Sequence, residues 1–137
     1  MKAIAASILA LAFSITPLPV AHAAEHCNAA TIQGSYGFTF SGFTPDVNGN
    51  NVPFAGTGVV TNDGQGNTQG TVIGSLNGSV IKFPYTGTYV VHPNCSGTLT
   101  STNGNANFSL AVVDGGNEVF GLATNGGTFT ADLKRIY

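Results

Sequence analysis

Turn signals divide residues 33–137 into short runs at nearly even intervals, and this spacing restricts the fold more than any other feature. Gly, Asn, Asp and Pro gather in the turns, while the runs are rich in Val, Thr, Phe and Tyr. Apolar residues recur with a period of two, which is typical of half-buried strands rather than helices. The expected strands are 33–42, 53–62, 67–76, 79–92, 95–102, 106–113, 118–124 and 128–137, joined mostly as successive hairpins.

An antiparallel meander of about eight strands with one apolar face has two economical shapes, a closed barrel and a two-layer sandwich. Closure removes the exposed strand edges. Only residues 42–53, which contain a long polar loop over 43–53, offer a connection long enough for a sandwich crossing. We therefore expect an all-β protein with a single antiparallel up-and-down β-barrel, and a β-sandwich is the alternative. Pro84 lacks an N–H group and is expected at an edge or a bulge.

The first 23 residues have the pattern of a secretory signal peptide. Lys2 precedes an apolar run over residues 3–15, and the small-x-small pattern Ala21-His22-Ala23 follows. The apolar run is shorter than the roughly 20 residues that a membrane-spanning helix needs. We expect cleavage before Ala24, a secreted or periplasmic protein, and no membrane insertion after signal cleavage.

Cys27 and Cys95 are the two cysteines of the chain. Two cysteines in an oxidising compartment normally pair. The predicted disulfide would tether an N-terminal segment, residues 24–33, to a turn in the middle of the β-barrel domain, residues 34–137. A redox or metal role for the cysteines is disfavoured, because the sequence has no C-x-x-C motif and no Cys/His cluster.

The charge of the chain argues against a nucleic-acid partner. Four Lys and Arg stand against six Asp and Glu, and loss of Lys2 with the leader leaves a net charge of −3. Binding to phosphates requires clustered basic residues, and only Lys134 and Arg135 are adjacent. His26 and His92 have no metal-binding spacing, so we expect no metal and no cofactor.

Five segments in order resemble a widespread type of short secreted bacterial β-barrel protein of unassigned function. They are GSYGF, FAGTGVVTNDGQGN, TGTYVVHPNCSGTLT, FSLAVVDGGNE and GTFTADLKR, and they cover nearly the whole chain after the leader. In strand count and size the chain is also loosely similar to the allene oxide cyclase-like barrels, within the calycin-like group of ligand-holding barrels. That similarity carries no matched catalytic motif. Such barrels include cyclases, dirigent proteins and carriers, so the resemblance implies a fold but does not choose among these activities.

Six aromatic residues on two predicted strands are the candidate ligand-binding residues: Tyr36, Phe38, Phe40, Phe83, Tyr85 and Tyr89. A tyrosine offers an apolar ring and a hydroxyl that orients a ligand. The same rings could instead fill the interior, because an eight-stranded barrel is just wide enough for its own side chains. Glycines on facing strands leave room for either the rings or a guest: Gly56, Gly58, Gly70, Gly74, Gly87 and Gly121.

The leading hypothesis is a secreted small β-barrel that binds a small hydrophobic ligand without catalysis. One alternative is a barrel cyclase-like enzyme that acts by positioning a hydrophobic substrate, with Tyr89, Glu118 and Asp132 as the first catalytic candidates. Another is an extracellular structural or self-associating module, a homo-oligomer, because several strands are apolar on parts of both faces. The sequence leaves these alternatives open.

Overall fold

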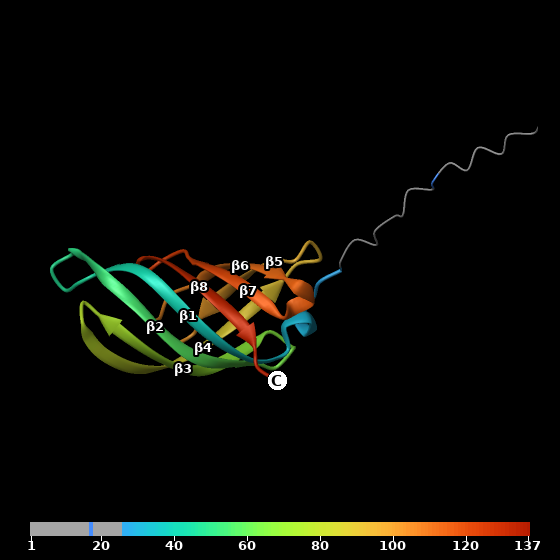
Figure 1. Cartoon of the computed structure of the whole chain (residues 1–137), viewed down its shortest axis with the longest axis horizontal. Coiled ribbons are helices and arrows are strands. Elements are labelled where there is room, and N and C mark those ends of the chain that lie inside the picture. The colour runs from blue at the N-terminus through green and yellow to red at the C-terminus, as the bar shows by residue number, and fades with distance from the viewer. Residues whose placement is uncertain (1–16, 18–25) are drawn as a thin grey trace, which may run out of the picture.

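The computed structural model describes Pro17 and residues 26–137, and within them the chain forms a closed eight-stranded barrel (Figure 1). Each strand pairs antiparallel with the next, and β8 pairs with β1. The strands are β1 (Gly34–Pro45), β2 (Asn51–Asn62), β3 (Asn67–Leu76), β4 (Ser79–Val91), β5 (Ser96–Ser101), β6 (Phe108–Val113), β7 (Glu118–Ala123) and β8 (Thr128–Arg135). The predicted up-and-down barrel is confirmed, and the sandwich alternative is wrong. The predicted signal peptide, residues 1–23, lies outside the described residues except for Pro17.

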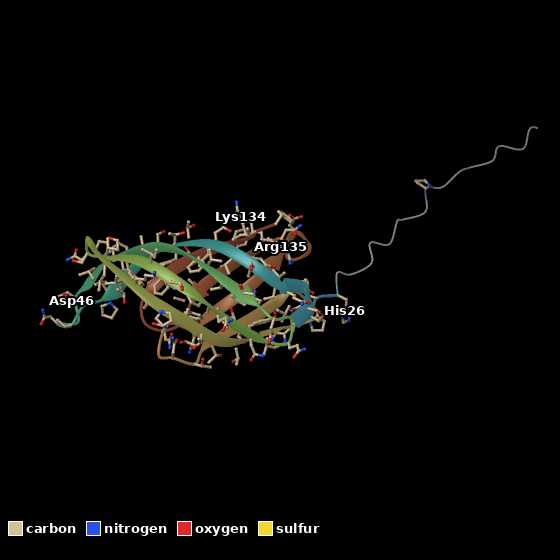
Figure 2. The ribbon with its side chains drawn as sticks, turned by 90° about the horizontal axis from the view of Figure 1, so that it is seen from below. His26, Asp46, Lys134 and Arg135 are labelled. Atoms are coloured by element: carbon tan, nitrogen blue, oxygen red, sulfur yellow. A yellow bond between two sulfur atoms is a disulfide. The ribbon has the colours of Figure 1, made fainter. Side chains whose placement is uncertain are left out.

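The two ends of the barrel differ. At one end, called the closed end below, lie the N-terminal segment with the 3₁₀ helix η1 (Ala29–Ile32), the short helix η2 (Asp114–Gly116) and the C-terminus. The turns that follow β1, β3, β5 and β7 lie at the other end, called the open end. Figure 2 shows His26 and Asp46 at these opposite ends. Since β1 to β4 are longer than β5 to β8, the β1–β2 and β3–β4 hairpins project beyond the rest of the wall at the open end (Figure 1).

The β1–β2 hairpin corrects one sequence prediction. The long polar loop predicted over residues 43–53 is a turn of only residues 46–50, because β1 continues to Pro45 and β2 begins at Asn51. Asp46 organises this turn: its carboxylate accepts hydrogen bonds from the backbone N–H groups of Asn48 at 2.8 Å and Asn50 at 2.9 Å. Such a local side-chain cap lets a polar Asn- and Gly-rich stretch close a hairpin tightly.

Pro84 lies where β4 has no partner on its β5 side. The β4–β5 ladder starts only at Gly87, which pairs with Ser101. The Pro84 carbonyl instead accepts hydrogen bonds from the Asn103 and Asn105 side-chain amides at 3.0 and 3.1 Å. The missing N–H of proline therefore costs no ladder bond, as predicted for an edge position.

The interior holds two groups of buried side chains. The first lies toward the closed end and includes Cys27, Ile32, Tyr36, Val60, Tyr89, Val91, Leu110, Val112 and Val119. The second lies nearer the open end and includes Phe40, Val72, Tyr85, Ala123 and Phe129. Inward-facing positions alternate with exposed ones along each strand, as the period of two predicts.

The disulfide between Cys27 and Cys95 forms as predicted and spans 68 residues of sequence. It holds the N-terminal segment against the β4–β5 turn, where the Cys27 N–H donates to the Pro93 carbonyl at 3.2 Å. The segment enters the barrel through Ile32, which is only 3% exposed. The N-terminal segment is therefore a plug for the closed end, and residues 27–33 are called the plug below.

Candidate functional site

The barrel interior contains a cavity of about 440 Å³. It reaches inward as far as Val60 and Leu133, and at the open end it extends to residues of the turns such as Pro45, Asn105 and Gly126. Residues from all eight strands line it, including Val60 and Leu110 of the closed-end group, and β7 contributes only Gly121. The projecting hairpins contribute Leu76 and Ile81 near the mouth. An elongated apolar cavity that opens at one end of the barrel is the shape expected of a site for a small molecule.

Five phenylalanine rings form one connected aromatic cluster along the cavity wall. Phe129 is central, with ring centroids 5.8 Å from Phe40, 5.5 Å from Phe54 and 5.7 Å from Phe108. The Phe40 ring also lies 4.8 Å from Phe54 and 6.3 Å from Phe38. Contacts of this kind stabilise the ring positions beyond simple burial. The cavity thus has a wall fixed by ring-to-ring packing.

The glycines of β2 give space to these rings. Phe38 pairs across the sheet with Gly58, and Phe40 pairs with Gly56. A Cβ atom at Gly58 would lie 2.6 Å from Phe38 Cζ, and one at Gly56 would lie 2.7 Å from Phe40 Cζ. Both rings therefore lie flat along the wall instead of crossing the interior, which preserves the cavity between them and the opposite strands.

The six predicted ligand-binding residues divide into two groups. Four line the cavity: Phe38, Phe40, Phe83 and Tyr85. The other two, Tyr36 and Tyr89, lie in the closed-end cluster. The structure therefore brings the first four together at the cavity and places the last two at its base.

The hydroxyls of Tyr36 and Tyr89 hold the closed end together. The Tyr89 hydroxyl donates to the Ala29 carbonyl of the plug at 3.1 Å and accepts from the Gly64 N–H at 3.0 Å. The Tyr36 hydroxyl donates to the Gly116 carbonyl of η2. Burial raises the pKa of both Tyr36 and Tyr89. Their hydroxyls are thus occupied by backbone groups of the plug, η2 and the β2–β3 turn.

Arg135 joins three segments at the same end. Its guanidinium donates to the Thr31 carbonyl at 2.9 Å, to the Gly116 carbonyl at 3.0 Å and to the Gln33 carbonyl. The guanidinium carbon also lies 5.2 Å from the centroid of the Tyr36 ring, a cation–π arrangement. The adjacent Lys134 side chain lies on the outer face, 70% exposed. Of the two adjacent basic residues, Arg135 therefore holds the closed end together, and Lys134 lies on the surface.

Polar groups at the cavity are few and neutral. The Tyr85 hydroxyl donates to the Ala106 carbonyl at 2.8 Å, and burial raises the pKa of Tyr85 to about 12. At the mouth, Thr44 donates to the Gly126 carbonyl at 2.6 Å, which ties the β1–β2 hairpin to the β7–β8 turn. Among the residues that line the cavity there is no Lys, Arg, His, Asp or Glu. The site is therefore suited to uncharged molecules, since a buried charge needs a partner.

The three catalytic candidates of the sequence analysis lie apart. Tyr89 faces the interior, whereas Glu118 and Asp132 lie on the outer face, 3.8 and 3.9 Å from the Lys134 amino group. One oxygen of Asp132 is buried without a hydrogen-bond partner in the described part of the chain. The structure thus does not assemble these three residues around one substrate, and their catalytic role stays a prediction.

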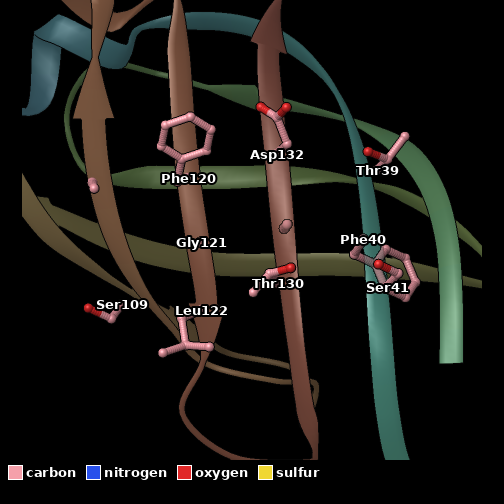
Figure 3. A pocket seen from close by; sticks show the side chains of 11 residues that line it. Thr39, Phe40, Ser41, Ser109, Phe120, Gly121, Leu122, Thr130 and Asp132 are labelled. Atoms are coloured by element: carbon pink, nitrogen blue, oxygen red, sulfur yellow. The ribbon is translucent and has the colours of Figure 1, made fainter. Parts of the chain in front are cut away.

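A second hollow of about 690 Å³ lies on the outer face of the barrel, over β6, β7, β8 and β1 (Figure 3). Small polar side chains such as Ser41, Ser109 and Thr130 surround Phe120 and Leu122. These two side chains are 45% and 50% exposed. Among the described residues that line this hollow, Asp132 is the only one with an ionisable side chain, so the hollow offers few groups for acid–base chemistry.

Among the described residues, no three His, Cys, Asp or Glu side chains gather into a possible metal-ligand set. The described residues also contain no helix of the length and apolarity needed to cross a membrane.

Several cavity residues were missed by the sequence analysis. The main ones are Phe54, Leu99, Asn105, Phe108, Asn125 and Phe129. Phe108 and Phe129 lie near the start of runs in which alternate residues are apolar, but this pattern does not distinguish a cavity wall from a filled core. Phe54 lies within the predicted strand 53–62, but the sequence analysis named no inward face for that strand. Asn105 and Asn125 come from turns, where no periodic pattern shows which way a side chain points.

No family profile matches the sequence, and no curated protein shows significant similarity to it.

Proposed function

We propose that this protein binds one small hydrophobic molecule inside its barrel and performs no chemistry on it. The cavity carries this proposal: about 440 Å³ of space, walled by aromatic and aliphatic side chains and reaching the open end. Small-molecule sites typically occupy about 300–1,000 Å³ and are lined mainly by hydrophobic residues. A barrel of eight strands is often filled by its own side chains. Here the glycines opposite Phe38 and Phe40 let the rings lie against the wall.

Because one end of the barrel is sealed, the structure favours a binding site rather than a channel. The plug is held by the disulfide, by Arg135 and by the Tyr89 hydroxyl, so one end of the interior is sealed by covalent and hydrogen bonds. At the open end the cavity is bordered by turns and by the ends of the projecting hairpins. A molecule would therefore enter and leave by the same mouth, which is the arrangement of a carrier.

The site of action that we propose is outside the cytoplasm, in the periplasm or the medium. Two observations support it: the signal-like sequence of residues 1–23 and the disulfide between Cys27 and Cys95. Disulfides persist in oxidising compartments and are rare in the cytosol. Tryptic mass spectrometry of the protein exported by its own host tests both the cleavage before Ala24 and the bond.

The proposed cavity is tested by filling it. Ala131 faces the interior between Phe129 and Leu133 and pairs across the sheet with Phe40 and Gly121. Ala131→Phe would place a ring in the cavity, whereas Thr130→Phe places the same ring on the outer face of the same strand. We expect wild-type protein and the Thr130→Phe variant to bind the neutral dye Nile red, and the Ala131→Phe variant to bind it at least about 10-fold more weakly.

Two controls complete this experiment. Far-ultraviolet circular dichroism establishes that each variant is folded. Native mass spectrometry of the exported wild-type protein detects a guest carried from the host as extra mass that is lost on denaturation. Equal dye binding by the wild type and the folded Ala131→Phe variant would remove the cavity as the binding site.

Self-association is a second candidate, supported by apolar side chains on the outer face. Val59, Ile73, Val90, Phe120 and Leu122 are each 45–52% exposed. Exposed apolar patches often mark contacts between proteins. Light scattering across a wide concentration range tests this candidate: a monomer throughout would exclude it, and a dimer disrupted by Phe120→Ser would support it.

A further inference from the structure

Two asparagine side chains at the mouth of the cavity offer hydrogen-bonding groups of opposite kind. Asn125 Oδ1 accepts from the Asn107 N–H at 2.6 Å, which directs its Nδ2 group elsewhere. Asn105 Nδ2 donates to the Pro84 carbonyl at 3.1 Å and to Asn103 Oδ1 at 2.9 Å, so these bonds use the amide nitrogen and leave Asn105 Oδ1 unused. Within residues 26–137, Asn125 Nδ2 and Asn105 Oδ1 have no partner. These two side chains therefore leave one donor and one acceptor unused within residues 26–137.

Both side chains line the cavity, and two hydrogen bonds hold their loops together. The Thr124 N–H donates to the Asn107 carbonyl at 2.8 Å, and the Asn107 N–H donates to Asn125. The loop after β5 and the turn after β7 are thus joined at the mouth. Asn105 lies two residues before Asn107, so the two asparagines come from adjoining loops at the opening.

Within residues 26–137, no charged side chain lines the cavity. Lys82 falls between Ile81 and Phe83, which line the cavity, but its own side chain is exposed on the outer face. Asp46, directly after the lining residue Pro45, is already engaged by the N–H groups of its turn. A bound carboxylate would find no cation here, and a bound ammonium would find no free carboxylate within the lining.

We propose that the ligand is an uncharged amphiphile, an aliphatic or aromatic molecule with one hydroxyl, whose hydroxyl lies at the mouth against Asn105 and Asn125. A hydroxyl fits because it accepts from Asn125 Nδ2 and donates to Asn105 Oδ1 at once. The apolar part extends inward along the phenylalanine cluster. This inference rests on the proposed function, because it names the chemical class of the molecule in that cavity.

The test compares probes of one chain length with different ends: 1-octanol, octane, octanoate and octylammonium, each displacing Nile red at neutral pH. We expect octanol to bind about 3- to 10-fold more tightly than octane, which is the usual gain from a neutral hydrogen bond. Octanoate and octylammonium should bind at least about 3-fold more weakly than octanol, because a carboxylate cannot donate to Asn105 and an ammonium cannot accept from Asn125, and neither meets a counter-charge.

Asn125→Asp isolates the donor. The aspartate keeps an oxygen for the Asn107 N–H but has no Nδ2 group, so octanol binding should weaken about 3- to 10-fold while octane binding is unchanged. Asn48→Asp is the matched control, since it adds the same charge to an exposed turn at the open end that does not line the cavity. The control should bind all four probes as the wild type does.

The outcomes separate this inference from the proposed function. Octanoate or octylammonium binding as tightly as octanol overturns the inference and leaves the cavity as a site. Octanol binding no more tightly than octane to the wild type overturns it too, whether or not the Asn125→Asp variant folds. Failure of Nile red and of all four probes to bind the wild type overturns the proposed function, and the inference with it.

Discussion

The Phe40 ring lies over Gly56, its partner across the β1–β2 ladder, so that an aromatic side chain occupies the space a Cβ atom would take. The same relationship joins Phe38 to Gly58, two residues along. On both strands the inward positions alternate with exposed ones. The glycine and the ring therefore act as a pair: the glycine admits the ring to the wall, and the ring covers the backbone that the glycine exposes.

Gly56→Ala should destabilise the barrel by about 1–3 kcal/mol, the usual cost of forcing extra volume into a packed interior. The new methyl group would meet the Phe40 ring and the Ile73 carbonyl, and the backbone oxygen cannot move aside as a side chain can. Urea unfolding measures the change. Gly37→Ala on β1 is the control, because a Cβ there would meet only Ile136 at an ordinary 3.5 Å. Equal stability of the two variants would contradict the pairing argument.

Removal of the disulfide in a Cys27→Ala, Cys95→Ala double variant should cost about 4 kcal/mol of unfolding free energy. The bond closes a loop over a separation of 68 residues, so its loss restores considerable entropy to the unfolded chain. The wild type with reductant and the double variant should unfold at the same urea concentration, well below that of the oxidised wild type. A midpoint unchanged by reduction would show that the plug is held by its hydrogen bonds alone.

The fold was predictable from local pattern because every connection in the barrel is local. Alternation placed the strands to within a few residues, and successive hairpins left closure as the economical topology. The correction at residues 43–53 has a specific cause: Asp46 caps its own turn, so the flanking polar residues pair as strands. Composition identifies that stretch as polar, but it does not show that the two sides of the turn are hydrogen bonded.

The site was predictable only in part. Alternation placed Phe38, Phe40 and Phe83 on an inward face, and the structure puts them at the cavity. The same alternation placed Tyr36 and Tyr89 inward, but it could not show that the plug uses their hydroxyls. Whether an inward residue meets a cavity or a plug depends on how far along the barrel axis it lies, and that coordinate is set by register and by long-range contacts.

Arg135→Lys should reduce the unfolding free energy by about 2 kcal/mol although the charge is kept. The guanidinium reaches three carbonyls of the plug and η2 at once and covers Tyr36, which the single ammonium of lysine cannot do. Lys134→Gln is the control: its ion pairs lie on the exposed face, so its effect should stay below about 0.5 kcal/mol. Urea unfolding measures the free energy of unfolding of the two variants. A larger loss of stability in Lys134→Gln than in Arg135→Lys would refute the structural role assigned to Arg135.

Alkaline pH should destabilise the protein in a window set by Tyr85. Burial raises its pKa in the folded state from an ordinary value of 10.0 to about 12. Below pH 10 the phenol is protonated in both states and its contribution is fully present. Between pH 10 and pH 12 the unfolded chain loses the proton while the folded barrel keeps it, so unfolding becomes progressively more favourable.

Because burial raises this pKa from 10.0 to about 12, the contribution of Tyr85 lost across this window is at most about 2–3 kcal/mol. Burial raises the pKa of Tyr36 and Tyr89 as well, so the wild type should lose more than this amount of unfolding free energy.

Urea unfolding at successive pH values measures how steeply stability falls with pH. The Tyr85→Phe variant isolates the contribution of one residue, since every other group titrates as before. The variant should be less stable near neutral pH, because the Ala106 carbonyl loses its donor, yet its stability should fall less steeply above pH 10. Identical slopes in the two proteins would mean that Tyr85 ionises in the folded barrel as easily as in the unfolded chain, and hence that water reaches its hydroxyl from the cavity.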